Sequence, residues 1–169
     1  MQAFHGNEEL KKGLLAEVEK HRIADQIIGG TYGRENNGKW QGCAVGCSIR
    51  SFNLLQGSDE EISDHAAYPR IFGIPQILAK LEDRIFEGLP DEDKAAWPGK
   101  FFNAIRPSAD LTTVWPKFAV WLLVDADNGV IRHATSKKTK SAIERVAELY
   151  RVNGTKDQFV EASSQARSA

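Results

Sequence analysis

Apolar residues recur at helical spacing along much of this 169-residue chain. Asn7 is a good helix N-cap, and Glu8 and Glu9 follow it in a first turn where the helix dipole favours acidic side chains. We expect the helix that begins there to continue to about Ile28, because Gly29 and the glycine after it stop a helix.

A second and clearer pattern lies between Gly73 and Gly88. Pro75 suits a first helical turn, and Gly88 with Pro90 marks the end of the helix. Four apolar residues form one face of it: Ile77, Leu78, Leu81 and Ile85.

Other local patterns predict further helices. Ser58 and Glu61 have the spacing of a capping box, so we expect a helix that contains His65 and that Pro69 ends or kinks. Two short helices are expected at about 91–97 and 98–105.

An amphipathic helix is expected at about 137–151, ending at Asn153 and Gly154. Asp110 is expected to cap a segment that runs to Val124. The stretch 118–134 fits a buried helix or a β-hairpin, since its Val, Trp and Ile residues favour strands. The helix is favoured, because no convincing third strand is available to a hairpin.

The remaining sequence is irregular. The stretch 29–50 contains much glycine, and Asn36-Asn37-Gly38 favours a tight hairpin turn. Residues 43–49 fit a short strand or a turn of helix equally well, and residues 155–169 resemble a frayed tail. The sequence therefore predicts a mainly α fold: one helical domain, residues 1–154, with a glycine-rich irregular or short hairpin insertion.

Composition narrows the classes of partner. With 41% hydrophobic and 27% charged residues the chain has the composition of a folded domain. Its formal net charge of -1 gives no general attraction to nucleic acid or to anionic membranes. No apolar run approaches the roughly 20 residues that cross a bilayer, and no secretory signal is visible. We expect a cytoplasmic protein whose partner is a small molecule or another protein; the oligomeric state does not follow from the sequence.

Two polar residues interrupt the apolar stripe of the first helix. His21 and Asp25 lie one turn apart on it, so Asp25 could orient the His21 imidazole, or the two could bind a metal together. A buried polar pair that ties the helix to a neighbouring backbone is the structural alternative.

Glu82 falls on the inner face of the helix between Gly73 and Gly88, whereas Asp83 and Glu87 are expected to point outward. A carboxylate in a core needs a cation, a metal or water. Arg22 or Arg84 is the ion-pair partner that the sequence offers.

These residues define the candidate site. His21, Asp25 and Glu82 are the candidates for catalysis, and with His65 they form a set suited to a divalent metal such as Zn, Mn or Fe(II). No His-Glu-x-x-His motif supports that set, so the convergence rests on helical wheels alone.

The two cysteines lie in the hexapeptide 42–47, Gly-Cys-Ala-Val-Gly-Cys. Their spacing differs from the Cys-x-x-Cys of thioredoxin-like proteins, and no second cysteine pair completes a zinc or iron-sulfur site. Buried free thiols are the main interpretation, with a reactive thiol served by His65 or His21 as the alternative. Cys43 and Cys47 are therefore assigned to the wall of a pocket, with the two glycines allowing close packing.

Three stretches together, residues 21–25, 42–47 and 73–89, resemble uncharacterised bacterial proteins of unknown function. The resemblance covers most of the chain and implies no activity and no functional residue.

Two functional hypotheses follow. The first is a partly buried polar pocket that binds a metal or a small molecule, with or without catalysis. The second is a non-catalytic interaction or regulatory module, whose polar core residues fix helix register and whose binding surface includes Trp97, Trp115 or Trp121.

Overall fold

The computed structural model describes the backbone of residues 1–167 and the side chains of residues 1–165. It is mainly helical, as the sequence predicts. Its contacts group the chain into two compact units, unit 1 (Met1–Thr112) and unit 2 (Thr113–Ala169). Each unit is described by itself.

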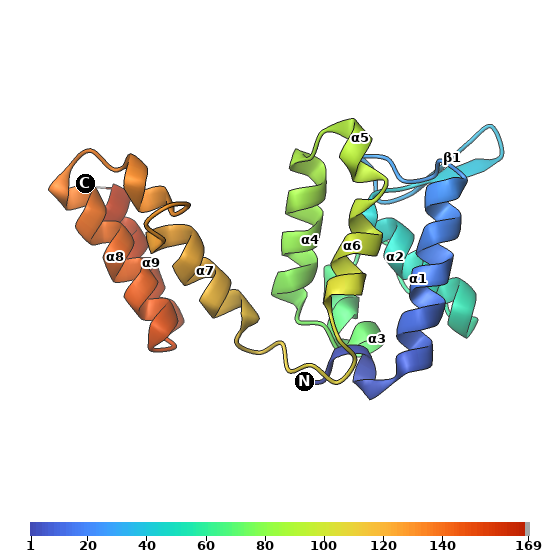
Figure 1. The fold of residues 1–169 in the computed structure, drawn as a ribbon, viewed down its shortest axis with the longest axis horizontal. Coiled ribbons are helices and arrows are strands. Elements are labelled where there is room, and N and C mark those ends of the chain that lie inside the picture. The colour runs from blue at the N-terminus through green and yellow to red at the C-terminus, as the bar shows by residue number, and fades with distance from the viewer. Residues whose placement is uncertain (168–169) are drawn as a thin grey trace. The chain divides into compact units, whose positions relative to one another are not determined.

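Unit 1 contains a short hairpin and several helices (Figure 1). In chain order the elements are η1 (Ala3–Gly6), α1 (Glu8–Ile23), β1 (Arg34–Asn36), β2 (Lys39–Gln41), α2 (Ala44–Gln56), η2 (His65–Ala67), α3 (Tyr68–Phe72), α4 (Gln76–Gly88), α5 (Asp91–Lys94) and α6 (Trp97–Ala104).

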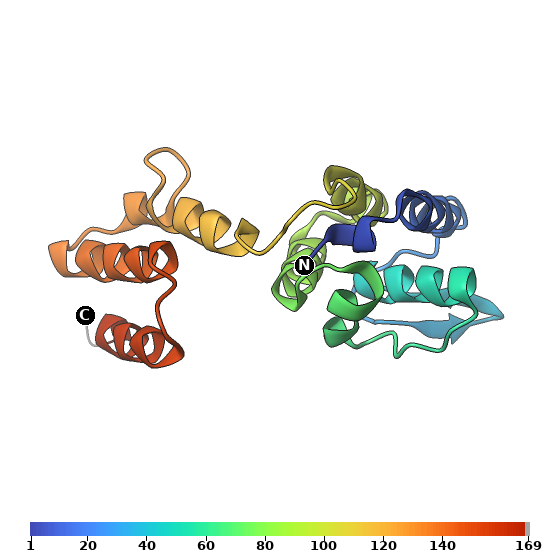
Figure 2. The ribbon, with the colours of Figure 1, turned by 90° about the horizontal axis from the view of Figure 1, so that it is seen from below.

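Helix α2 lies at the centre of unit 1 and packs against α1, α4 and α6. Figure 2 shows α2 as a layer beside the other three helices, with the β1–β2 hairpin next to it. The core around α3 and α6 is aromatic. The Phe72 ring lies 5.0 Å from that of Tyr68 and 5.4 Å from that of Phe102, and all three residues are fully buried. Edge-to-face pairs at such distances add to the stability that burial supplies.

Helix α1 begins as predicted and ends early. The Asn7 side chain accepts a hydrogen bond from the Leu10 amide, so the predicted N-cap is confirmed. The helix stops at Ile23, where the predicted end is about Ile28. Asp25 has a left-handed φ of 52°, which turns the chain before the glycine pair is reached.

The hairpin and α2 follow the glycine-rich stretch. Asn37 (φ 52°) and Gly38 (φ 75°) make the predicted two-residue turn, in which both central residues need a positive φ. Strands β1 and β2 pair in antiparallel fashion, with Asn36 opposite Lys39. Residues 44–56 are helical, so the ambiguity at residues 43–49 is resolved as the first turns of α2, capped by Cys43.

The prediction of a helix that starts at Ser58 is wrong, because residues 58–61 are not helical. The Ser58 hydroxyl donates to Asn53 Oδ1 at 2.9 Å, and the Asn53 side chain also holds the Glu60 amide and carbonyl. The side chain that would cap a helix is therefore used to close a loop. Pro69 stands in the first turn of α3, where its missing N–H costs nothing, and does not end a helix.

Unit 2 contains α7 (Val114–Val124), η3 (Val130–His133), α8 (Lys137–Arg151) and α9 (Lys156–Arg167). Helix α8 packs against both α7 and α9 (Figure 2). Residues 114–124 are helical, so the helix is confirmed over the hairpin, but it is not the buried helix expected, since Ala119 is its one buried residue. Helix α8 has the predicted bounds.

Helix α9 lies where the sequence predicts a frayed tail. The Thr155 hydroxyl accepts from the Gln158 amide, and the Gln158 side chain accepts from the Thr155 amide, which together form a capping box. The Phe159 ring then packs 4.7 Å from that of Tyr150. The last two residues of the predicted tail, 168–169, lie outside the described residues.

None of the helices within the described chain has the length and apolar character that crossing a membrane requires.

Candidate functional site

His21 is buried on the inner face of α1, in line with Leu14 and Val18. Its Nδ1 lies 2.6 Å from Gln26 Oε1, so Nδ1 carries the proton in this arrangement. Burial lowers the pKa of His21; the Gln26 contact opposes this shift and the Arg50 charge adds to it. His21 is therefore a buried imidazole with one side-chain partner; among the described residues its Nε2 has none, and no hydrogen bond to a neighbouring backbone is present.

Asp25 does not pair with His21. It lies beyond the end of α1, its side chain is 90% exposed, and its closest ionic partner is Lys39 at 3.8 Å. The prediction is wrong because α1 ends at Ile23 and is capped by Ala24, so Asp25 is not on the helical wheel.

Glu82 is fully buried on α4, so its predicted inward position is confirmed. Its partner is neither of the predicted arginines. The Tyr68 hydroxyl donates to Glu82 Oε2 at 2.8 Å, and among the described residues Oε1 has no hydrogen-bond partner. Burial raises the pKa of Glu82 to about 8; the Tyr68 hydrogen bond opposes this and Asp83 adds to it. The carboxyl is therefore mostly neutral at pH 7.

His65 lies on η2 and contacts Asp83, the neighbour of Glu82. The distance from His65 Nε2 to Asp83 Oδ2 is 3.2 Å, and both side chains are half-buried. The Tyr32 ring meets the imidazole edge-on with centroids 5.7 Å apart. Asp83, expected to point outward, is thus part of a polar cluster with His65 and Tyr32.

Both cysteines are buried free thiols. Burial raises the pKa of Cys43 to about 12, with the Gly46 amide opposing and the carboxylates of Asp83 and Glu87 adding. Burial also raises the pKa of Cys47, whose thiol donates to the Gly42 carbonyl oxygen. Neither sulfur is a ready thiolate, so the geometry supports the wall assignment and gives no support to a reactive nucleophile.

The predicted metal set does not assemble. Within residues 1–167 no group of three or more His, Cys, Asp or Glu side chains is placed to hold a metal ion. His21 bonds to Gln26, Asp25 faces outward, His65 bonds to Asp83, and Glu82 bonds to Tyr68.

A small cavity lies beside the His65–Asp83 pair, and we call it the Tyr32 pocket. Its volume is about 200 Å³. Six residues line it: Gly30, Thr31, Tyr32, Cys43, Asp83 and Glu87. Only one of the predicted site residues, Cys43, is part of this lining.

Backbone hydrogen bonds hold the wall of the Tyr32 pocket in place. The Cys43 amide donates to the Thr31 carbonyl at 2.7 Å, and the Ile28 amide donates to the Gly42 carbonyl at 2.9 Å. On the opposite side, both Glu87 carboxylate oxygens accept from the Gly30 amide, at 3.0 and 3.1 Å. Segment 28–32 is therefore fixed to the start of α2 and to α4.

Two glycines set how closely α2 approaches this segment. A Cβ atom on Gly46 or on Gly42 would overlap the Tyr32 carbonyl oxygen. The absence of side chains at both positions lets the first turn of α2 lie directly against the Tyr32 backbone.

The charged side chains that line the Tyr32 pocket are all of one sign. Two of the residues that line it are charged, and both are acidic: Asp83 and Glu87. Burial raises the pKa of Tyr32, and the charge of Asp83 adds to this shift ahead of the smaller effects of Cys43 and Glu87. The nearby carboxylates disfavour a further negative charge, so the Tyr32 phenol and the Cys43 thiol stay neutral. The same carboxylates would attract a cation.

A larger cleft of about 650 Å³ shares Gly30 and Glu87 with the Tyr32 pocket. Arg34, Asp91 and Lys94 are among its lining residues, so its charge is mixed. Lys94 Nζ pairs with Asp91 at 2.9 Å. The cationic residues Arg34 and Lys94 line this cleft and are not part of the lining of the Tyr32 pocket.

The sequence interpretation missed Tyr32, Asp83 and Glu87. Asp83 and Glu87 are four residues apart on α4, a spacing that places both on one face. The sequence shows that spacing, but it does not show that segment 28–32, which is distant in sequence, lies against this face of α4.

Comparison with family models, with curated proteins and with solved structures finds no match to this chain.

Proposed function

We propose that unit 1 binds small organic cations, such as protonated primary amines, in the Tyr32 pocket. The observation that carries the proposal is the arrangement of charge: the carboxylates of Asp83 and Glu87 line a cavity of about 200 Å³, and both are fixed by hydrogen bonds. A carboxylate that is already held in position loses little freedom when an ammonium group binds to it.

The other residues of the pocket suit the same ligand. Tyr32 offers an aromatic ring, which attracts cations through its π face. His65 holds Asp83 through one oxygen, Oδ2, which leaves Oδ1 to accept from a ligand. Cys43 contributes a neutral, buried sulfur, so no charge opposes the cation there.

An NMR titration of the full chain with propylamine, propanol and propionate tests this proposal. We expect propylamine to bind about tenfold more tightly than propanol, because only the amine makes a charge-assisted hydrogen bond. Amide shifts should be largest at residues 30–32 and 83–87. Asp83→Asn should remove the preference, while Asp59→Asn, an exposed carboxylate outside the pocket, should keep it.

Equal affinity for the amine and the alcohol would refute a cation site. Shifts that fall outside the pocket, or a preference unchanged in Asp83→Asn, would refute this location for it.

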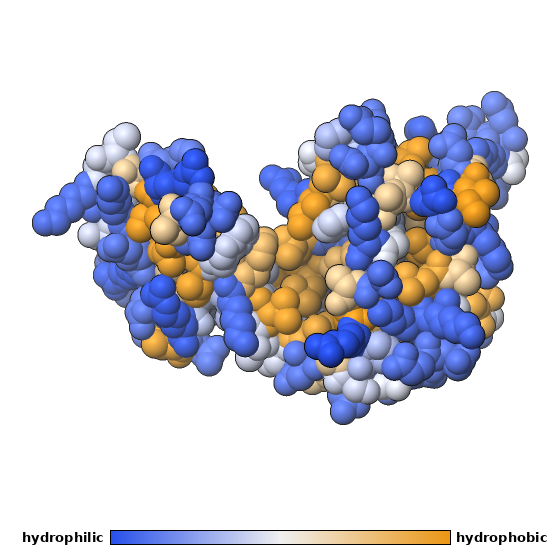
Figure 3. Space-filling model, in the orientation of Figure 1, coloured by the Kyte–Doolittle hydropathy of each residue, from blue (hydrophilic) through white to orange (hydrophobic). Residues whose placement is uncertain are grey.

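A second function, protein interaction, is favoured by one face of α7. Val114, Phe118, Trp121 and Leu122 lie on that face at helical spacing, and Trp121 is 44% exposed. Figure 3 shows apolar residues at the surface of unit 2 among polar ones. Exposed apolar faces of this kind mark sites of contact with other proteins.

A second copy of the chain is the partner that can be tested directly. Sedimentation velocity over a range of concentrations should show a dimer that Trp121→Ser weakens and that Lys117→Ser does not. A monomer at every concentration would exclude self-association through this face.

A further inference from the structure

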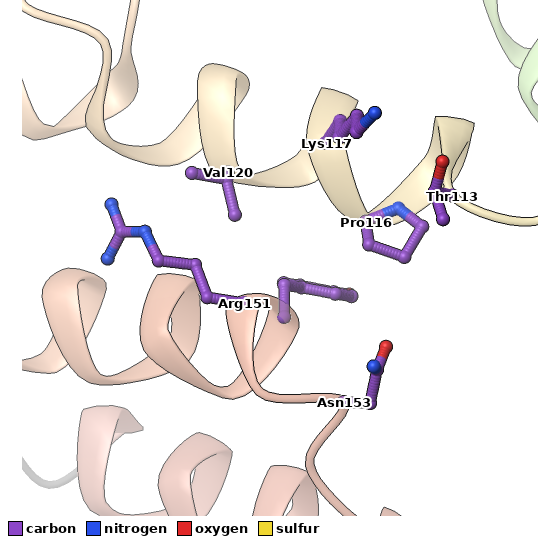
Figure 4. Close-up of a pocket in the computed structure, with 7 residues that line it drawn as sticks. Thr113, Pro116, Lys117, Val120, Arg151 and Asn153 are labelled. Atoms are coloured by element: carbon purple, nitrogen blue, oxygen red, sulfur yellow. The ribbon is translucent and has the colours of Figure 1, made fainter.

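A groove runs between α7 and α8 within unit 2 (Figure 4). Its volume is about 330 Å³, at the lower end of the range typical of small-molecule sites. The residues that line it are Thr113, Pro116, Lys117, Val120, Tyr150, Arg151 and Asn153. None of these residues belongs to the Tyr32 pocket.

The floor of the groove is apolar. Pro116 and Val120, one helical turn apart, point from α7 toward α8 in Figure 4. Tyr150 on α8 also lines the groove, and its ring contacts those of Trp115 at 6.2 Å and Phe159 at 4.7 Å. A floor built from such rigid groups is already formed before any ligand enters.

Polar groups stand at the two ends of this floor. Arg151 extends beyond Val120 at one end, and Asn153 rises from the end of α8 at the other (Figure 4). Asn153 can point there because it has a left-handed φ of 52°, just after the helix ends, while the Gly154 amide donates to the Leu149 carbonyl. Lys117 lies on the side of α7 away from α8.

The Arg151 guanidinium has N–H donors that its contact with Glu148 does not use. One of its nitrogens, Nη1, pairs with Glu148 Oε2 at 3.0 Å, and both side chains are exposed. A guanidinium carries five N–H donors, so a second carboxylate can be bound alongside Glu148 or in its place. The lining favours an anion as well, because its charged residues, Lys117 and Arg151, are both cationic.

We propose that this groove binds small amphipathic carboxylates, with the apolar body on Pro116, Val120 and Tyr150 and the carboxylate on Arg151. The site lies in unit 2 and is independent of amine binding in unit 1. The groove volume of about 330 Å³ favours a ligand of modest length. Because Arg151 lies at one end of the floor, a ligand with one carboxylate is favoured.

Octanoate, octanol and octylamine are the probes, because they share one apolar chain and differ in the head group. We expect octanoate to bind to the full chain about tenfold more tightly than octanol, and octylamine to bind most weakly. Amide shifts in NMR should be largest at residues 113–120 and 150–153.

Variants of Arg151 and Glu148 are expected to change octanoate affinity in opposite directions. Arg151→Gln should reduce octanoate affinity to the level of octanol, and octanol binding should stay unchanged. Glu148→Gln should increase octanoate affinity severalfold, because it removes the carboxylate that competes for the guanidinium. Arg145→Gln is the matched control: it removes an equally exposed arginine of α8 that lies outside the groove, and it should leave both affinities unchanged.

The proposal is overturned if octanoate and octanol bind equally well, if Arg151→Gln keeps the preference for octanoate, or if Glu148→Gln weakens octanoate binding. Shifts that cluster away from the groove would also overturn it.

Discussion

Gly46 lies directly against the carbonyl oxygen of Tyr32, so closely that a single added carbon atom would overlap it. The contact joins the first turn of α2 to the segment that carries the aromatic wall of the Tyr32 pocket. The role of the glycine is therefore to let two backbones meet, and the shape of the pocket depends on it.

The first prediction concerns this contact. Gly46→Ala should lower the free energy of unfolding by about 1–3 kcal/mol, because overpacking outweighs the better helix propensity of alanine. Gly88→Ala is the control: Gly88 ends α4, and its Cβ would meet no atom within 4 Å. That substitution should be neutral or should stabilise the protein by up to about 1 kcal/mol. Urea unfolding measures both, and an unaffected Gly46→Ala protein would disprove the close packing.

The second prediction concerns pH. Folding raises the pKa of Glu82 from 4.5 to about 8, so between these values the folded chain holds a proton that the unfolded chain has released. The contribution of Glu82 to stability is therefore complete below about pH 4.5 and declines as pH rises to about 8, by at most about 1.4 kcal/mol per pH unit.

Glu82→Gln removes this titration. As pH rises from about 5 to about 8, the wild type should lose unfolding free energy relative to the variant. Urea unfolding at several pH values measures it. A difference that stays constant with pH would show that Glu82 is ionised in the folded protein.

The third prediction isolates the Tyr68 hydroxyl. Tyr68→Phe keeps the ring contacts with Phe72 and Phe102 but leaves Glu82 Oε2 without its donor. We expect a loss of about 1–3 kcal/mol, the cost of a buried polar group without a partner.

The double variant Tyr68→Phe with Glu82→Met serves as the control for that loss. It should recover part of the stability, because both partners are then apolar. A double variant less stable than the sum of the two single variants would contradict this account.

The fourth prediction concerns the thiols. At a pH of about 8, Cys43 with a pKa of about 12 should react with a thiol reagent on the order of a thousandfold more slowly than an unfolded cysteine. Cys47, equally buried, should be protected as well. Ellman's reagent, followed with and without denaturant, gives both rates. Rapid labelling of one thiol in the native protein would restore the reactive-cysteine hypothesis.

Features decided by neighbouring residues could be predicted from the sequence. The Asn7 cap, the 137–151 helix and the turn at Asn37 and Gly38 follow from local side-chain chemistry. The inward position of Glu82 follows from the helical wheel of α4, on which it shares the buried face with Leu78, although Ile77 of the predicted apolar face is exposed.

The failures have local causes as well. Ser58 has the spacing of a capping box, but the Asn53 side chain binds its hydroxyl. The pattern Thr155 to Gln158 has the same spacing and does cap a helix, α9. The spacing alone therefore does not separate the two cases; what distinguishes them is that the Asn53 side chain also binds the Glu60 amide and carbonyl, which holds residues 58–60 in a loop.

The Tyr32 pocket could not be predicted, because its walls come from separate parts of the chain. Asp83 and Glu87 look like a solvent-facing pair on α4, and the structure shows that Glu87 stays exposed while it binds the Gly30 amide and that Asp83 is partly covered. That placement depends on the contact of Gly46 and Gly42 with the Tyr32 backbone, and a glycine carries no side chain that would reveal its partner.

The neutral carboxyl of Glu82 also makes folding a proton-consuming reaction near neutral pH. An unfolded chain at pH 7 has released the Glu82 proton, and the folded chain, with a pKa of about 8 at this site, takes one up from the solvent. The buffer supplies that proton, so the heat measured on unfolding should depend on the ionisation enthalpy of the buffer. Burial lowers the pKa of His21, which shifts the proton balance the other way, so calorimetry in phosphate and in Tris on both the wild type and Glu82→Gln would count the protons that accompany the burial of Glu82 alone.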